Sequence, residues 1–258
     1  MIHKTAIISA GCQIHDDAII GPYCIVDENV SIGEGTELIS NVHISGNTKI
    51  GKNNKFFPFS SIGMIPQDKK FTGEDSQLII GNDNVIREHV TINPGTRKGG
   101  MKTLIKNKCL FMVGSHIAHD CQISSNVIMS NNATLAGHVK IYENVIIGGL
   151  CGIHQFVSLG KYSMIGGMSG VGLDIIPYGL YTGIRGKLRG LNLIGLKRKG
   201  VEKKTIKKIQ ENFNKIFDNT NPILTNIENL NEEEKSIVEI EEIIEFIQIH
   251  IERGICNI

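Results

Sequence analysis

Four of the nine histidines lie close together in the sequence, and they are the side chains best suited to chemistry. His116 and His119 fall in Ser-His-Ile-Ala-His-Asp-Cys, His138 in Leu-Ala-Gly-His-Val and His154 in Gly-Ile-His-Gln-Phe. Histidine gains and loses a proton near neutral pH, so this cluster indicates general acid–base catalysis. Imidazoles also bind zinc, which leaves a metal site as the alternative from another class.

A six-residue repeat must position these histidines. Large apolar side chains recur at every sixth residue from Ile2 to Ile62, from Ile80 to Ile92 and from Ile105 to Val171. Four residues after each apolar site the side chain is small, and three residues after it Gly, Asn or Asp is common. Along a strand the apolar and the small side chain both point inward, and Gly, Asn and Asp tolerate the positive φ of a sharp corner. The repeat therefore predicts a solenoid of short strands, a parallel β-helix.

Two interruptions of the repeat predict loops, which in a solenoid gather on a functional face. The loops span 64–77 and 94–103, and both are polar and contain glycine. After Val171 the repeat stops, and from about Gly190 the apolar residues take helical spacing. We expect a β-helix over 1–173, a connecting segment over 174–189 and an α-helical domain over 190–258. One of its helices should begin at Asn231, where Glu234 completes a capping box.

Composition argues against several classes of function. A formal net charge of +1 gives no argument for a nucleic-acid partner or an anionic membrane. No apolar run approaches the ~20 residues that span a bilayer, and the repeat begins at Ile2 without a signal-peptide pattern. We therefore expect a cytoplasmic protein with no membrane insertion. Five of the six cysteines occupy the small inward site, where a thiol packs as a small hydrophobe and not in a disulfide.

The repeat resembles that of the left-handed β-helix acyltransferases, triangular prisms in which three hexads, or eighteen residues, make one coil. Over nearly its whole length, the chain is similar to the UDP-N-acetylglucosamine O-acyltransferases that begin lipid A synthesis. The resemblance rests on His-Ile-Ala-His-Asp-Cys at 116–121, Asn-Asn-Ala-Thr-Leu-Ala-Gly-His-Val at 131–139, Ile-His-Gln-Phe at 153–156, Pro-Gln-Asp at 66–68 and Gly-Leu-Lys-Arg-Lys-Gly at 195–200. It implies an all-β left-handed parallel β-helix of hexapeptide repeats with a C-terminal α-helical domain.

With eighteen residues to a coil, His119, Gly137 and Gln155 stack above one another, with His138 and His154 beside this column. His119 follows Ile117 by two residues, so we expect it to point outward on an exposed line with no role in the core. Folding does not require such a column, which favours a site. The alternative is that Asp120 and His138 only tolerate positive φ at a corner.

The resemblance assigns roles within the column. It implies that His119 is the general base that takes the proton from a sugar 3-hydroxyl, and that the oxygen then attacks the thioester of a 3-hydroxyacyl chain on acyl carrier protein. Asp120 would orient the base. Gly137 would present its N–H to the oxyanion, and its missing side chain would let the substrate approach the backbone.

Further residues match the family's substrate contacts. Those implied for the sugar, the phosphates and the acyl chain are Asp68, Lys70, His116, His138, His154 and Gln155; those for the nucleotide are Asn192 and Arg198. Gly167 and Met168 align with the region that limits acyl length. The resemblance also implies homotrimers with sites between subunits, and no cofactor or metal.

A basic stretch precedes an acidic one in the C-terminal part. The segment 185–208 holds ten Lys or Arg against one acid, Glu202. We predict that it docks the acidic carrier protein, against the alternative of a solvated helix face. The docking residues expected are Arg185, Lys203, Lys204, Lys207 and Lys208. Two other functions stay open: transfer to a 3-amino analogue of the sugar nucleotide, and a zinc lyase of the gamma carbonic anhydrase type.

Overall fold

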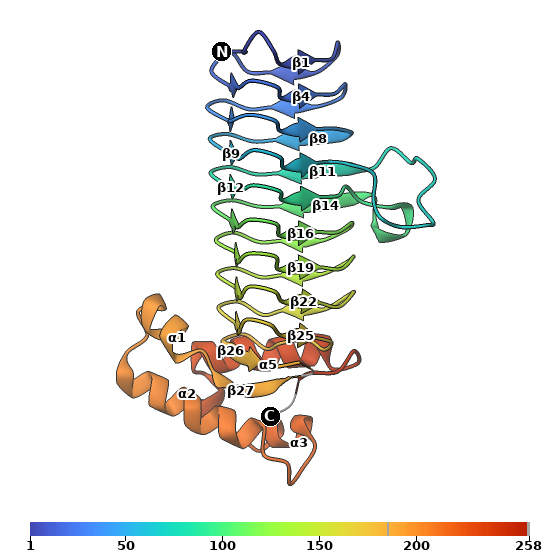
Figure 1. Cartoon of the computed structure of the whole chain (residues 1–258). Coiled ribbons are helices and arrows are strands. Elements are labelled where there is room, and N and C mark those ends of the chain that lie inside the picture. Colours follow the sequence, from blue (N-terminus) through green and yellow to red (C-terminus); the bar gives the residue numbers. More distant parts are fainter. Residues whose placement is uncertain (185, 257–258) are drawn as a thin grey trace.

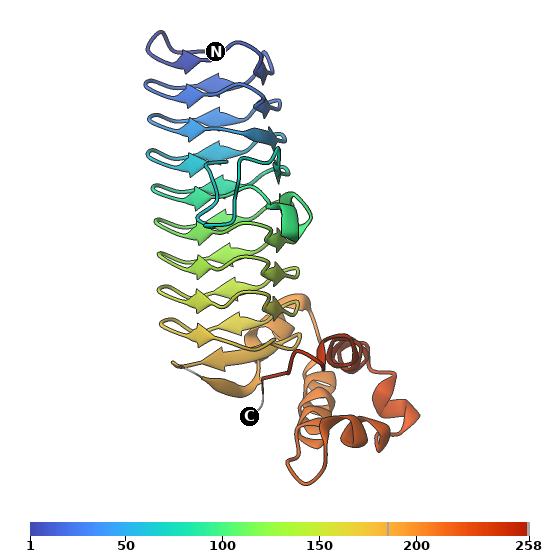
Figure 2. The same cartoon turned by 90° about the vertical axis from the view of Figure 1, so that its right-hand side faces the viewer.

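The computed structural model describes residues 1–184 and 186–256, which form a tall triangular β-helix with helices at its C-terminal end (Figure 1). Short strands alternate with corners, and each coil adds one strand to each of three sheets (Figure 2). Ile7 pairs in parallel with Ile25, eighteen residues later. The six-residue period thus fixes the coil, because three hexads return the chain to the same sheet.

Sheets I and II form two faces of the prism. Sheet I has nine strands: β1 (Ile7–Ile8), β4 (Ile25–Val26), β7 (His43–Ile44), β10 (Ser61–Ile62), β13 (Thr91–Ile92), β16 (His116–Ile117), β19 (Thr134–Leu135), β22 (Gly152–Ile153) and β25 (Gly170–Val171). Sheet II has eight strands: β2 (Gln13–Ile14), β5 (Ser31–Ile32), β8 (Asn47–Ile50), β11 (Gln77–Ile80), β14 (Lys102–Ile105), β17 (Gln122–Ile123), β20 (Lys140–Ile141) and β23 (Ser158–Leu159).

Sheet III forms the third face and ends in an antiparallel pair. Its ten strands are β3 (Ile19–Ile20), β6 (Glu37–Leu38), β9 (Lys55–Phe56), β12 (Val85–Ile86), β15 (Leu110–Phe111), β18 (Ile128–Met129), β21 (Ile146–Ile147), β24 (Met164–Ile165), β26 (Gly179–Thr182) and β27 (Lys187–Leu191). β26 continues the sheet in parallel to β24, and β27 returns antiparallel to it. The segment 174–189, which we expected to be a connection, therefore also extends the sheet.

The interior of the prism holds the repeated apolar site, as at Ile44, Phe111 and Leu135, each without solvent exposure. The corners carry positive φ where the repeat predicts it, for example at Asn29 and Asn126. Bulky side chains adopt the same conformation elsewhere, as at Leu150, whose N–H is held by the carbonyl of Asn131 in the preceding coil. Coil stacking thus imposes the corner even on residues that do not favour it.

Both interruptions leave the prism at the corner between sheets I and II. We call them loop L1, residues 63–76 between β10 and β11, and loop L2, residues 93–101 between β13 and β14, which contains the 3-10 turn η1 (Arg97–Gly99). They project together from one edge of the prism (Figure 1). Glu74 of L1 accepts hydrogen bonds from Arg97 N of L2 at 3.0 Å and from Thr72 N at 2.8 Å. This carboxylate therefore ties the two loops together.

The C-terminal helices pack against the last coils. They are α1 (Leu193–Lys199), α2 (Lys203–Ile216), α3 (Ile223–Glu228), α4 (Glu232–Lys235) and α5 (Val238–His250). α4 begins with the predicted capping box of Asn231 and Glu234. Arg253, just after α5, donates from Nε to the buried Asp174 at 2.9 Å and from a terminal nitrogen to the carbonyl of Gln155 at 3.0 Å. In the described part of the chain, no helix is long and apolar enough to cross a membrane.

Candidate active site

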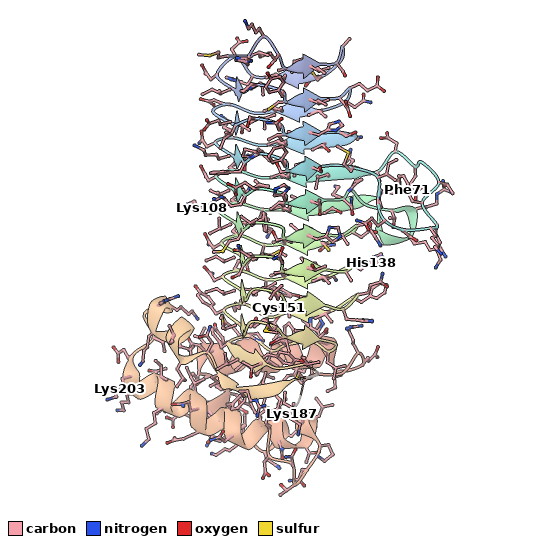
Figure 3. All side chains as sticks on the ribbon, in the orientation of Figure 1. Phe71, Lys108, His138, Cys151, Lys187 and Lys203 are labelled. Carbon is pink, nitrogen blue, oxygen red and sulfur yellow. The ribbon has the colours of Figure 1, made fainter. Side chains whose placement is uncertain are left out.

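The predicted column lies at the corner between sheets I and II, beside L1 and L2. His138 N donates to the carbonyl of His119 at 3.0 Å, and Phe156 N donates to the carbonyl of Gly137 at 3.2 Å. His119, Gly137 and Gln155 therefore follow one another from coil to coil, as the eighteen-residue spacing predicts. Figure 3 shows His138 on the same side of the prism as Phe71 of L1.

His119 is buried, which corrects the expectation that it lies on an exposed line. Only 9% of its side chain is exposed. The ring contacts Asp120 and meets the edge of the His138 ring at a centroid distance of 5.1 Å. The hexad correctly directs the side chain away from the core, but the pattern carries no information on what covers it from outside.

Gly137 supports the imidazole of His119 directly. A Cβ added to Gly137 would lie 2.7 Å from His119 Nε2 and 3.0 Å from Nδ1, which is closer than van der Waals contact allows. We expected the missing side chain to admit the substrate, but the ring of His119 occupies that space. Glycine is therefore required at this position by the base itself.

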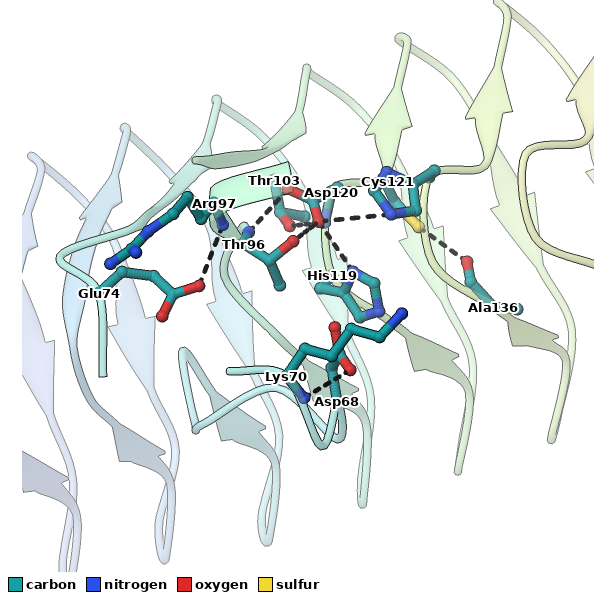
Figure 4. Close-up of polar contacts among 11 residues, drawn as sticks. Asp68, Lys70, Glu74, Thr96, Arg97, Thr103, His119, Asp120, Cys121 and Ala136 are labelled. Atoms are coloured by element: carbon teal, nitrogen blue, oxygen red, sulfur yellow. Dashed lines mark hydrogen bonds and ion pairs between the residues drawn. The ribbon is translucent and has the colours of Figure 1, made fainter. Parts of the chain in front are cut away.

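Asp120 fixes the orientation of His119 from the other side. Its side chain has no solvent exposure, and its Oδ2 lies 2.8 Å from His119 Nδ1 (Figure 4). Thr96 of L2 donates from its N to Asp120 Oδ1 at 2.8 Å and from its hydroxyl to Oδ2 at 2.6 Å. Because the carboxylate only accepts, Nδ1 of His119 carries the proton and Nε2 keeps its lone pair. This is the tautomer that a general base needs.

His138 and His116 flank the base as neutral groups. Burial lowers the pKa of His138, and His119 lowers it further, against the opposing charges of Asp120 and Asp68. Burial also lowers the pKa of His116, again with a contribution from His119. Each therefore offers uncharged imidazole nitrogens at neutral pH. The His116 Nδ1 lies 2.7 Å from the hydroxyl of Thr91.

The remaining corner residues are more open. His154 and Gln155 are exposed two coils beyond His119, and Phe156 stacks on His138 at 4.4 Å. From L1, Asp68 and Lys70 lie beside His119 (Figure 4), and Asp68 accepts from Lys70 N at 3.0 Å. Two loops and three coils therefore bring together the polar groups expected to meet one substrate.

Asn192 and Arg198 lie elsewhere. They line a cavity of about 610 Å³ over sheet III, whose floor includes Ile128, Ile146 and Met164. Asn192 also caps α1 by accepting from Gly195 N at 3.0 Å, a role that the sequence did not indicate. Sheet III is the face opposite the corner between sheets I and II, so one chain does not bring these residues to His119.

An apolar cavity of about 670 Å³ lies along sheet I beside the histidines. Its walls run from Thr134, Ala136 and His154 to Tyr181 and Ile184. Gly167 and Met168 do not line it. They lie at the corner between sheets III and I, where Met168 is 66% exposed.

The basic stretch is partly neutralised by acids of the same chain. Lys208 pairs with Glu233 at 3.0 Å, and Lys207 lies 3.8 Å from Glu211. Lys203 and Lys204 are exposed on the first turn of α2. Arg185 lies outside the described residues.

Within the described part of the chain, His119, Asp120 and His138 form a group that could hold a metal ion, with donor atoms within 4.8 Å of one another. Oδ2 of Asp120 already faces the Thr96 hydroxyl and His119 Nδ1. The arrangement is thus organised to hold a proton on Nδ1, and the zinc lyase interpretation is not favoured.

Comparison with known proteins connects this site to one family. A family model described as UDP-N-acetylglucosamine O-acyltransferase, domain 2, matches residues 174–256. The acyl-[acyl-carrier-protein]–UDP-N-acetylglucosamine O-acyltransferase of Aliarcobacter butzleri is 52% identical over 86% of this chain and 85% of its own. The enzyme of the same name from Paracoccus denitrificans is 54% identical, over 60% of this chain and 59% of its own length.

Solved structures agree over the whole chain. LpxA of Acinetobacter baumannii is 42% identical with a TM-score of 0.95, covering 99% of both chains. The UDP-N-acetylglucosamine acyltransferase of Campylobacter jejuni is 36% identical with a TM-score of 0.92, covering 100% of both. The predicted left-handed parallel β-helix with C-terminal helices is confirmed, and the chain belongs to the UDP-N-acetylglucosamine O-acyltransferase family.

Proposed function

We propose that the protein transfers a 3-hydroxyacyl chain from acyl carrier protein to the 3-hydroxyl of UDP-N-acetylglucosamine, the first step of lipid A biosynthesis. One observation carries this proposal: a buried imidazole whose Nδ1 is held by Asp120 and whose Nε2, beside Gly137, has no hydrogen-bond partner among the described residues and can accept a proton. The names of the relatives supply the substrates.

The chemistry follows from this geometry. Nε2 of His119 takes the proton of the 3-hydroxyl while the sugar oxygen bonds to the thioester carbonyl carbon. The tetrahedral intermediate then collapses, the carbon–sulfur bond breaks, and the imidazolium returns its proton to the departing thiolate. The products are the ester and the free thiol of the carrier, with all protons accounted for.

Gly137 N–H is available for the oxyanion of that intermediate. Gly137 is buried, yet among the residues that the structure describes its N–H has no hydrogen-bond acceptor. The N–H at the same corner place of neighbouring hexads, as at Asn131 and Gly149, has no backbone acceptor among the described residues either, so the fold leaves this group unpaired by construction. At Gly137 the unpaired N–H lies beside His119, where an oxyanion hole requires a donor.

The separation of the two groups of contacts supports a site between subunits. Asn192 and Arg198 lie over sheet III, while His119 lies at the opposite corner. One nucleotide sugar reaches both groups only if they come from different chains. The assembly we propose is a homotrimer, in which the sheet III cavity of one subunit faces the histidine corner of the next.

The apolar cavity along sheet I is suited to an acyl chain. It begins one coil beyond His116, at Thr134, and continues toward the C-terminal end. Gly167 and Met168 lie at the exposed corner between sheets III and I, which borders the cavity, and are proposed to limit the length of the acyl chain. Lys203 and Lys204 are proposed to contact the acidic carrier protein. With these substrates we expect the protein to act in the cytoplasm.

The test is product analysis with purified protein, 3-hydroxyacyl carrier proteins and UDP-N-acetylglucosamine. Mass spectrometry should find the acylated nucleotide sugar, and mild alkali should release the acyl group because it is an ester. An alkali-stable product formed only from the 3-amino analogue would instead establish amide transfer. Absence of transfer to either acceptor would contradict the proposal.

A complementation experiment tests the shared site. His119→Ala and Arg198→Ala should each have low activity as pure trimers. When the two chains are co-expressed, mixed trimers should regain activity, because some sites combine an intact His119 with an intact Arg198. No recovery in verified mixed trimers would place both residues in one subunit's site.

A further inference from the structure

Thr96 of loop L2 holds the carboxylate of Asp120 at two points. Its N–H donates to Oδ1 at 2.8 Å and its hydroxyl donates to Oδ2 at 2.6 Å. Two donors on different oxygens fix the plane of the carboxylate. Thr96 itself is 4% exposed, so water does not compete for these hydrogen bonds.

The hydroxyl of Thr96 also limits which other hydrogen bonds Oδ2 of Asp120 can accept. A carboxylate oxygen has about two acceptor positions, and Oδ2 of Asp120 faces Thr96 Oγ1 and His119 Nδ1. His138 Nε2 lies farther from Oδ2, at 3.8 Å. With both acceptor positions occupied, turning the carboxylate away from the imidazole would break both hydrogen bonds. The proton on His119 therefore stays at Nδ1, and the lone pair stays at Nε2.

The local conformation of L2 positions Thr96 beside the Asp120 carboxylate. The carbonyl of Thr96 accepts from Gly99 N at 3.0 Å and from Met101 N at 2.9 Å, which closes the turn around η1. Gly99 packs so closely that a Cβ added to it would overlap the carboxylate of Asp120. The backbone of L2 is thus shaped to cover the Asp120 carboxylate.

We propose that Thr96 is a positioning residue for the acyl transfer, the third member of a Thr96–Asp120–His119 chain that fixes the tautomer and orientation of the base. The proposal rests on the proposed function. It differs from a role in which Thr96 only anchors L2, because it predicts an effect on turnover and tautomer with substrate binding preserved.

Thr96→Val tests the chain, since valine keeps the branched shape and the backbone N–H and replaces the hydroxyl with a methyl group that cannot donate. We expect kcat to fall about 10- to 100-fold, because small misplacements of a catalytic group have effects of this size. The KM values for both substrates should change by less than about twofold. Thr96→Ser, which restores the hydroxyl, should regain most of the activity.

Nitrogen NMR of histidine-labelled protein gives a readout that a structural role would not change. The His119 signals, assigned by their loss in His119→Ala, should show Nδ1–H in the wild type and a mixture of tautomers in Thr96→Val. Thr36→Val is the matched control, because Thr36 is buried and lies several coils from His119. Its hydroxyl donates to the carbonyl of Gly51 at 2.9 Å. This variant should lower the melting temperature similarly and leave kcat unchanged.

The outcomes separate this proposal from the proposed function. Wild-type kcat in Thr96→Val together with an inactive His119→Ala would overturn the role of Thr96 and leave the base in place. Wild-type kcat in both would overturn the assignment of His119 as well. Raised KM values with an unchanged tautomer would show an anchoring role and would also overturn the positioning chain.

Discussion

Gly137→Ala should disable the enzyme by displacing its base. Gly137 does not have positive φ, so its backbone accepts alanine without strain. The new Cβ would nevertheless lie 2.7 Å from His119 Nε2 and 3.0 Å from Nδ1. The substitution therefore adds one methyl group at the atom that accepts the proton.

The size of the effect follows from the overlap. Ordinary van der Waals contact begins near 3.4 Å, so the ring or its coil must move by a large part of an ångström. A displacement of ~1 Å at a catalytic group costs on the order of 10²-fold in rate. Overpacking of this kind also costs ~1–3 kcal/mol of stability.

A double-mutant cycle isolates the cause. In the His119→Ala background the ring is gone, so Gly137→Ala should then cost little further stability. Gly152→Ala is the stability control, because its added Cβ would meet no atom within 4 Å. Wild-type kcat in Gly137→Ala, or an equal loss of melting temperature in both backgrounds, would refute the steric reasoning.

Three further predictions concern the surface, the groove and the loops. Lys203→Glu with Lys204→Glu should raise the KM for acyl carrier protein steeply and in a salt-dependent way, while that for the nucleotide sugar stays constant; equal changes in both would indicate a solvated face or a folding defect. Gly167→Met adds a side chain at the corner that borders the apolar cavity and should shift preference toward shorter acyl chains, since each methylene that loses its apolar contact is worth ~1–3 kcal/mol; an unchanged preference across a donor series would rule out this corner as the limit on chain length. Hydrogen bonds from the backbone of Thr72 and Arg97 lower the pKa of Glu74 to about 2. The link between the loops is therefore complete above 4.5, the ordinary pKa of a glutamate, and is lost as the pH falls toward 2. The melting temperature of Glu74→Gln should accordingly lie below that of the wild type near pH 6 and converge with it in acid, and a gap that is constant with pH would argue against this link.

The coils and the column were predictable because both depend on a local period. Each hexad specifies its own strand and corner, so the positive φ at Asn126 can be read from six residues. The alignment of His119 with Gly137 and Gln155 then follows from counting eighteen residues. No contact between distant segments is needed for either inference.

What the sequence did not reveal depends on segments outside the period. The proposed role of Thr96 depends on L2, whose path is set by its own turn and by contact with Asp120. The surroundings of the buried His119 include Asp68 and Lys70 of L1 (Figure 4). The capping role of Asn192 and the continuation of sheet III by β26 need the packing of the C-terminal part. The spacing did place Gly137 next to His119. Only the structure shows that the His119 ring leaves no room for a side chain at position 137.

The most direct test of the account is the turnover of purified His119→Ala with acyl carrier protein donor and UDP-N-acetylglucosamine. Loss of a general base should lower kcat by ~10²–10⁴-fold, with the melting temperature, the oligomeric state and the affinity for the nucleotide sugar close to those of the wild type. Near wild-type turnover in this variant would contradict the assignment of His119 as the base that the fold of this chain positions.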